Sequence, residues 1–210
     1  MQMPEEETFA VLVKLMQDYR MREMFKPSMA ELGLCMYQLE VLVQEHISDL
    51  YGHFQSQSIH TNLYASSWFL TLFTTSLPIH LSCRIMDCFL ADGIEAIFRL
   101  ALALLMLGKN ELLVQDMEGV IRVRIYFFDG SSAGSKWRPS HFLLFCRPFL
   151  LQYFQKDMPA KFEADPEGVI NLAFSIKINQ KKMKKLEREY TTMKTKEKED
   201  EIELRVSFLL

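Results

Sequence analysis

Apolar residues recur every three or four positions along the first half of the chain, and proline or glycine interrupts each run. This pattern constrains the fold more than any other feature, because a period near 3.6 residues describes one buried face of a helix. It predicts successive helices at residues 4–25, 28–47, 62–74, 78–92, 94–107 and 111–117. We therefore expect an all-α array without internal repeats.

Boundary residues support these helices. Pro4, followed by three glutamates, is typical of a helix start, since the acids suit the positive end of the helix dipole. Ser28 and Glu31 predict a capping box. Gly93 is expected to end one helix, and residues 108–110 (Gly-Lys-Asn) to separate two others. The helix at 94–107 is apolar on nearly all sides, which predicts a central position.

Composition excludes several classes of protein. The net charge of -3 argues against binding nucleic acid through overall positive charge. Four cysteines in 210 residues imply no disulfide framework, so a reducing cytoplasm is expected. The N-terminus lacks the basic start and apolar run of a secretory signal. The longest uncharged stretch, 61–79, is nearly half polar and predicts a buried helix, so no transmembrane segment is expected.

Enzyme and metal motifs were sought next. His80, Cys83 and Cys88 fall roughly on one helix face, but their spacing favours a packed helix over a zinc site. No glycine-rich phosphate loop, nucleophile elbow or metalloprotease signature occurs in the sequence. We therefore predict no catalytic residue, no cofactor and no metal ligand.

Two further groups have alternative interpretations. Aromatic side chains at helical spacing predict core packing rather than a binding box: Tyr64, Trp68, Phe69 and Phe73. The basic run 181–185 is compatible with binding of anionic lipid or RNA. A solvated helix face is the favoured interpretation, because acidic residues follow directly.

The tail differs from the body in charge. Residues 177–205 hold ten basic and seven acidic residues, net +3, and so predict a long charged helix. Its apolar positions follow the seam of a coiled coil for about two heptads: Met183, Leu186, Tyr190 and Met193. The next seam positions, Glu197 and Asp200, are charged.

Residues 120–150 break the helical pattern. They contain seven of the 25 aromatic residues in only 31 positions. Residues 120–128 alternate and predict a strand, and 129–135 form a Gly/Ser turn. A lone strand has no evident pairing partner in a helical array.

Several segments resemble the TBC domain of Rab GTPase-activating proteins. The clearest are YASSWFLTLF at 64–73, Leu-Pro at 77–78, RIMD at 84–87, and Gly93. Two flanking segments look like the ecotropic viral integration site five subfamily, in which a long coiled coil follows the TBC domain: MFKPSMAELGL at 24–34 and KKMKKLEREYTTMKTKEK at 181–198.

The resemblance implies the following organisation of the chain. The C-terminal part of a TBC domain covers 1–119, its end covers 151–176, and a coiled-coil start covers 177–205. The segments 120–150 and 206–210 depart from the family. They are hypothesised to be translated intron, because in the family the flanks of 120–150 are nearly contiguous and Val-Ser at 206–207 matches a read-through splice donor.

In the family an arginine finger and a glutamine finger, supplied in trans, accelerate GTP hydrolysis by a bound Rab. An arginine finger contributes on the order of 10³–10⁵ in rate. Both belong to blocks upstream of the match. No Ile-x-x-Asp-x-x-Arg occurs here, and Tyr153-Phe154-Gln155 fits Tyr-x-Gln in the wrong place. We therefore carry over no catalytic residue and expect a homologue that is itself inactive, a GTPase activator by lineage rather than an enzyme.

The resemblance also implies a Rab GTPase as partner, a coiled-coil partner or homodimer, and a cytoplasmic location with peripheral attachment to endomembranes in vesicle trafficking. Two alternatives remain open. One is a non-catalytic module that binds a Rab or a coiled coil, and the other is a mis-spliced fragment whose exposed apolar faces would favour aggregation.

Overall fold

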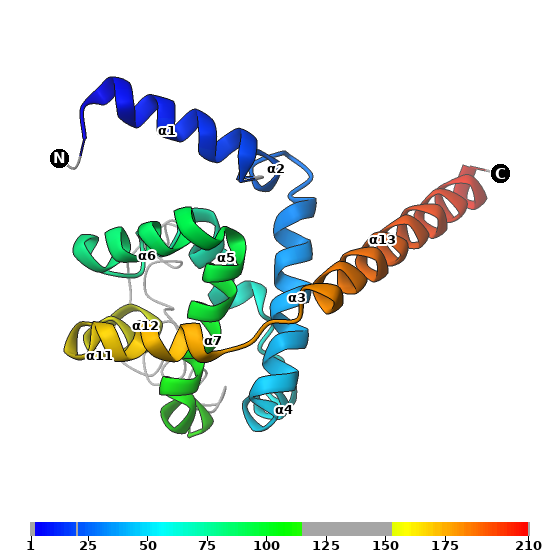
Figure 1. Cartoon of the computed structure of the whole chain (residues 1–210). Helices are drawn as coiled ribbons and strands as arrows, with labels where there is room; N and C mark the ends of the chain where they lie inside the picture. The colour runs from blue at the N-terminus through cyan, green and yellow to red at the C-terminus, as the bar shows by residue number, and fades with distance from the viewer. Residues whose placement is uncertain (1–2, 20, 115–152, 210) are drawn as a thin grey trace, which may run out of the picture.

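The structure is a computed structural model that describes residues 3–19, 21–114 and 153–209 (Figure 1). Within these residues every regular element is helical, which confirms the predicted all-α class. The elements are α1 (Glu5–Asp18), α2 (Met21–Met24), α3 (Ala30–His46), α4 (Ser48–Ser56), α5 (Asn62–Thr71), α6 (Ile79–Asp92), α7 (Ile94–Leu113), the π-helical turn η1 (Tyr153–Asp157), α11 (Met158–Ala164), α12 (Pro166–Ser175) and α13 (Gln180–Leu209). The strand and turn predicted at 120–135 lie outside the described residues.

Helix α7 is the centre of the body, as its sequence predicts. It contacts α3, α4, α5, α6, α11 and α12. Apolar residues on all its sides are buried, and Ile97, Ala101, Leu102 and Leu105 are each 0% exposed. A helix surrounded by packed neighbours needs no polar face, which explains why its sequence lacks the usual amphipathic pattern.

The predicted break at residues 108–110 is wrong, because α7 continues through them to Leu113. A Cβ atom added at Gly108 would lie 2.1 Å from the hydroxyl oxygen of Tyr153. Glycine is therefore required here by the close approach of a side chain. It does not end the helix.

The helix ends are partly as predicted. Pro4 precedes α1, Pro78 precedes α6, and Gly93 ends α6 with a φ of 71°. The predicted capping box is wrong: α3 begins at Ala30 after Met29, whose φ is 45°, and no side chain caps it. The left-handed residue reverses the chain before the helix, so Ser28 is too early to act as its cap.

The first predicted helix is in fact two helices, α1 and α2. Helix α1 ends at Asp18, and Tyr19 directs its side chain to α6, where its hydroxyl donates to the Leu90 carbonyl at 2.8 Å. This tertiary contact explains the early end. No prediction was made for α4, whose short polar sequence gives little periodic signal. It follows α3 after a single residue, Ile47, with a φ of -139°.

The two terminal helices extend away from the body (Figure 1). Helix α1 is held at its C-terminal end, where Leu15 is buried, while Phe9 is 68% exposed. Helix α13 is held at its N-terminal end and projects on the other side. No helix in the described part of the chain combines the length and apolar character that a membrane span requires.

Candidate functional site

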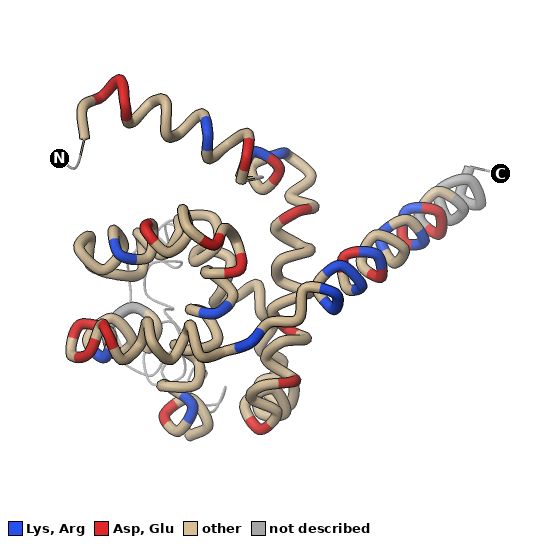
Figure 2. The backbone as a smooth tube through the Cα atoms, in the orientation of Figure 1, with Lys and Arg blue, Asp and Glu red and all other residues tan. Residues whose placement is uncertain are grey.

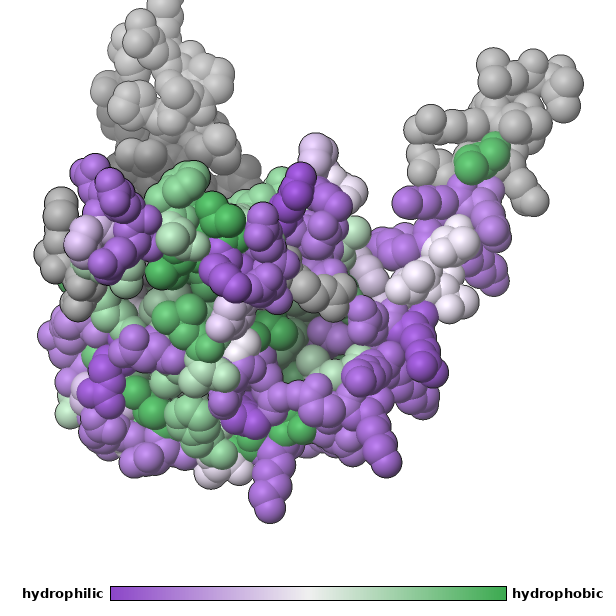
Figure 3. All heavy atoms as spheres, turned by 45° about the horizontal axis from the view of Figure 1, so that its top comes forward, coloured by the Kyte–Doolittle hydropathy of each residue, from purple (hydrophilic) through white to green (hydrophobic). Residues whose placement is uncertain are grey.

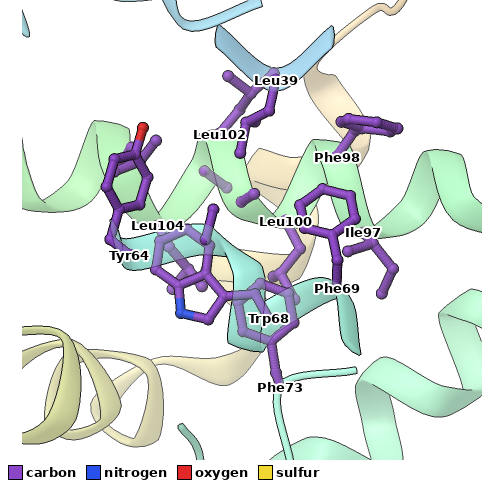
Figure 4. Close-up of a cluster of buried hydrophobic side chains, with 14 of the residues drawn as sticks. Leu39, Tyr64, Trp68, Phe69, Phe73, Ile97, Phe98, Leu100, Leu102 and Leu104 are labelled. Carbon is purple, nitrogen blue, oxygen red and sulfur yellow. The ribbon is translucent and has the colours of Figure 1, made fainter. Parts of the chain in front are cut away.

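The aromatic block of the TBC-like segment lies in the core (Figure 4). Tyr64, Trp68, Phe69 and Phe73 are at most 3% exposed, which confirms the predicted core packing. The Trp68 ring stacks on Phe73 at 5.3 Å between centroids and meets the edge of Tyr64 at 5.5 Å. Such pairs add about 0.5–1.5 kcal/mol beyond area burial. The block is therefore scaffold.

A left-handed turn follows α5 and sets the direction of α6. Leu72 and Phe73 have φ values of 47° and 64°, a region that costs non-glycine residues energy. Both side chains are buried, at 5% and 0% exposure, and so packing holds the turn in place. The Phe73 N–H donates to the Trp68 carbonyl at 3.1 Å. This turn presents the outer face of α6, where the RIMD segment lies.

The RIMD segment places two charges at the surface. Arg84 and Asp87 are exposed on α6, whereas Ile85 is buried. Arg84 Nη2 lies 2.5 Å from Glu167 Oε1 on α12. Since both side chains are about half exposed, the pair adds at most about 1 kcal/mol. It still ties α6 to α12, and so the arginine is occupied within the chain.

A second arginine, Arg99 on α7, lies in a more enclosed site. Its side chain is 21% exposed and contacts Asp92 at 3.0 Å and also Glu95. The guanidinium carbon lies 5.9 Å from the centre of the Phe174 ring, within cation–π range. Its Nε is buried, and no residue in the described part of the chain forms a hydrogen bond with it. Arg99 therefore joins the start of α7 to α6 and α12.

The residues considered for a metal site are dispersed. His80 is 60% exposed, with Nε2 3.9 Å from Glu163 Oε1. Cys83 and Cys88 are half-buried, and burial raises the pKa of the Cys88 thiol. No group of three or more His, Cys, Asp or Glu side chains suited to a metal is found among the described residues.

An apolar cavity lies between α6, α7 and α12, and its lining includes Cys88, Arg99 and Phe174. Its volume is about 20 Å³. A single water needs about 10–15 Å³ on this measure, and ligand sites are typically about 300–1,000 Å³. The cavity therefore has room for a water and none for a cofactor.

The Tyr-x-Gln match at residues 153–155 begins with a tyrosine that is buried in the core. Tyr153 and Phe154 are 1% and 3% exposed, in η1. Burial raises the pKa of Tyr153 to about 12, and its buried hydroxyl has no hydrogen-bond partner among the described residues. The side chain of Gln155 lies outside what the structure describes.

The first three turns of α13 pack antiparallel on α3. Near the start of α13, Lys182 Nζ lies 2.7 Å from Glu45 Oε2. Two turns of α3 earlier, Gln38 Nε2 donates to the Met183 carbonyl at 3.1 Å. Leu186 is 5% exposed at this contact. Three of the predicted coiled-coil seam positions therefore face α3 of the same chain rather than a second chain.

Tyr190 closes this contact at the far end. Its ring centre lies 5.7 Å from that of Tyr37. A Cβ atom at Gly33 would lie 2.2 Å from the Tyr190 hydroxyl oxygen. The next seam residue, Met193, is 42% exposed, so the packed part of α13 ends near Tyr190. The sequence did not predict this face of α3, and its one local signal is the glycine in the first turn of the helix.

Comparison with known proteins identifies the class of this helical assembly. Residues 1–130 match the family described as RabGAP TBC domain. This match covers more than half of the chain, which therefore belongs to that family.

Within the family the chain is similar to ecotropic viral integration site 5 proteins. The human Ecotropic viral integration site 5 protein homolog is 51% identical over 205 residues, which is 98% of this chain and 22% of that protein. The Drosophila melanogaster ortholog is 55% identical over 190 residues, 90% of this chain and 20% of that protein. The Caenorhabditis elegans Rab GTPase-activating protein eat-17 is 44% identical over 205 residues, which is 98% of this chain and 20% of that protein. The chain spans about a fifth of the length of these curated relatives.

Proposed function

We propose that these 210 residues form a Rab-binding part of a Rab GTPase-activating protein and supply neither an arginine finger nor a glutamine finger. The observation that supports Rab binding is the 44% identity to a protein named a Rab GTPase-activating protein, over 98% of this chain. The expected partner is a Rab GTPase on the cytoplasmic face of endomembranes, in vesicle trafficking.

The contacts of Arg84 on α6 and Arg99 on α7 argue against either residue acting as an arginine finger. Such a finger must extend into the nucleotide site of the bound GTPase. Arg84 is paired with Glu167, and Arg99 is held between Asp92 and Glu95 at 21% exposure. Releasing either would break contacts between α6, α7 and α12. The side chain of Tyr153, the first residue of the Tyr-x-Gln match, is buried in the core.

Catalysis and binding are tested separately. The purified chain is incubated with a panel of GTP-loaded Rab proteins, and phosphate release is measured beside the full-length human relative as positive control. We expect no stimulation of hydrolysis by the chain. A pull-down with the same Rab proteins, loaded with GTP or GDP, is expected to retain at least one. Stimulation above the intrinsic rate would refute the absence of fingers, and retention of none would refute Rab binding.

The alternative of an unstable fragment is tested by hydrogen exchange. The described body contains one continuous buried cluster that includes residues from α1 to α7, η1, α11 and α12, which supports a stable fold. Amides of residues 96–105 in α7 are expected to exchange most slowly, since nearly all side chains of this stretch are buried. Rapid exchange throughout α7 would favour the unstable fragment instead.

A further inference from the structure

The packing of α13 on α3 fixes which side of α13 faces solvent. Met183, Leu186 and Tyr190 recur at three and four residues and lie against α3. Residues at the same spacings on the opposite side must point away from the body. Those residues are Lys181, Lys184, Lys185 and Arg188, and all four are exposed. Here they are called the basic face.

Three of the four cations of the basic face, Lys181, Lys184 and Arg188, have no ion-pair partner among the described residues. Lys109, Lys161 and Lys182 each pair with a carboxylate on another helix. Of the basic face, only Lys185 pairs with a described carboxylate, Glu189 at 3.4 Å on the same helix. Exposed Lys177 precedes the face in the linker from α12. Together with Lys177, the four cations of the basic face lie within twelve residues of sequence. Figure 2 shows Lys and Arg positions gathered at the start of α13.

We propose that the basic face binds the surface of a membrane rich in anionic phospholipid. Clusters of four to eight Lys or Arg on a helix are typical of such binding, and each cation strengthens it about fivefold. The face is straight, points away from α3 and is uninterrupted by apolar residues. The start of α13 is correspondingly hydrophilic, whereas hydrophobic surface shows over the body (Figure 3). These features suit peripheral contact with a flat charged surface without insertion.

Binding of single-stranded nucleic acid is less well supported. Such sites combine cations with aromatic side chains on which bases stack. The basic face carries no aromatic residue, because Tyr190 lies on the α3 side of the helix. The net charge of -3 for the whole chain gives no general attraction for polyanions, so any binding must come from a local face.

The proposal is tested by co-sedimentation of the chain with vesicles, without any GTPase present. The vesicles contain phosphatidylcholine alone or with about 30% phosphatidylserine. We expect binding only to the latter, and loss of that binding at high salt. The triple variant Lys181→Glu/Lys184→Glu/Arg188→Glu is expected to lose at least about a hundredfold, on the estimate of fivefold per cation.

The matched control is Lys194→Glu/Lys196→Glu/Lys198→Glu, which changes the net charge equally on the same helix. Acidic residues surround those lysines, and it is expected to bind within about threefold of the wild type. Equal losses in both variants would overturn the assignment to the basic face. Equal binding of the wild type to both vesicles, or binding to RNA or polyglutamate but not to vesicles, would overturn the membrane proposal. Because no Rab is present, these outcomes are independent of the proposed Rab binding.

Discussion

Two tyrosines lie against glycines within helices, and they differ in their surroundings. Tyr153 of η1 lies on Gly108 of α7, and Tyr190 of α13 lies on Gly33 of α3. A Cβ atom at the glycine would lie 2.1 Å from the hydroxyl oxygen in the first case and 2.2 Å in the second. Tyr153 is 1% exposed, whereas Tyr190 is half-buried beside solvent. The contact of Tyr153 with Gly108 lies in the core, whereas the contact of Tyr190 with Gly33 holds the projecting helix α13 on α3.

The difference shows that the energetic cost of a close contact depends on how far the neighbouring side chains can move. At Gly108 three atoms of the tyrosine lie within 3 Å of the added Cβ position, and the ring is enclosed by α7, η1 and α11. At Gly33 only the hydroxyl oxygen lies that close, since Cζ is 3.3 Å away. The end of an exposed side chain can move into solvent, but a buried ring displaces its neighbours.

Truncating the two tyrosines is expected to give the largest contrast. Tyr153→Ala should lower the free energy of unfolding by about 3–5 kcal/mol, the usual cost of removing a buried aromatic ring. Tyr190→Ala should lower it by about 1 kcal/mol, because its side chain is already partly exposed to water. Chemical denaturation followed by circular dichroism measures both. Equal losses would show that α13 is as much a part of the core as η1.

The two contacts also show the limits of sequence analysis. Periodicity and boundary residues predicted α6 and the start of α7 well, because Pro78 and Gly93 lie at the ends of these helices. Gly108 was interpreted as a break, since nothing local shows that Tyr153, 45 residues later, requires the space. The aromatic block was correctly predicted as core from its spacing alone.

The α3 face was missed for the same physical reason. Gln38 donates a hydrogen bond to the Met183 carbonyl, which lies 145 residues further along the chain. The apolar row on α13 is real, but its spacing does not say whether a second chain or α3 covers it. Periodicity identifies a face that must be covered, and only tertiary structure identifies what covers it.

Replacing each glycine by alanine tests the same difference between the two contacts. Gly108→Ala should destabilise the fold by about 2 kcal/mol, as overpacking of the buried ring exceeds the gain in helix propensity. Gly33→Ala should change the free energy of unfolding by less than about 0.5 kcal/mol, because a small movement of Tyr190 is offset by the gain of about 0.5–1 kcal/mol for alanine in a helix. Denaturation midpoints check both, and a larger loss at Gly33 would reverse the comparison.

The hydroxyl of Tyr153 predicts a dependence on pH. Burial raises its pKa from 10.0 to about 12, so the folded state retains a proton that the unfolded state loses. The contribution of this group to the free energy of unfolding is therefore complete below pH 10 and is lost as the pH rises through about 12. About 1 kcal/mol of stability should be lost by pH 11 through this group.

The variant Tyr153→Phe should remove this loss. At neutral pH its stability should be at least that of the wild type, because the variant removes a buried hydroxyl without a partner. Urea denaturation at pH 8 and pH 11 measures the change, and Tyr190→Phe removes the same hydroxyl from the half-exposed site as control. If both variants reduce the pH dependence equally, the effect does not arise from burial.

The smallest expected effect concerns the ion pair that aligns α13 on α3. Lys182 and Glu45 are 2.7 Å apart, with side chains 34% and 48% exposed, so the pair should contribute about 0.5 kcal/mol. Glu45→Lys or Lys182→Glu alone should expose the amides of residues 183–190 to faster hydrogen exchange. The double exchange should restore the wild-type rate, since the pair is re-formed with reversed polarity. Protection in α7 should not change in any of the three variants, because local opening of α13 leaves the core intact. Faster exchange at residues 191–200 in the single variants would instead show that the packed part of α13 extends beyond Tyr190.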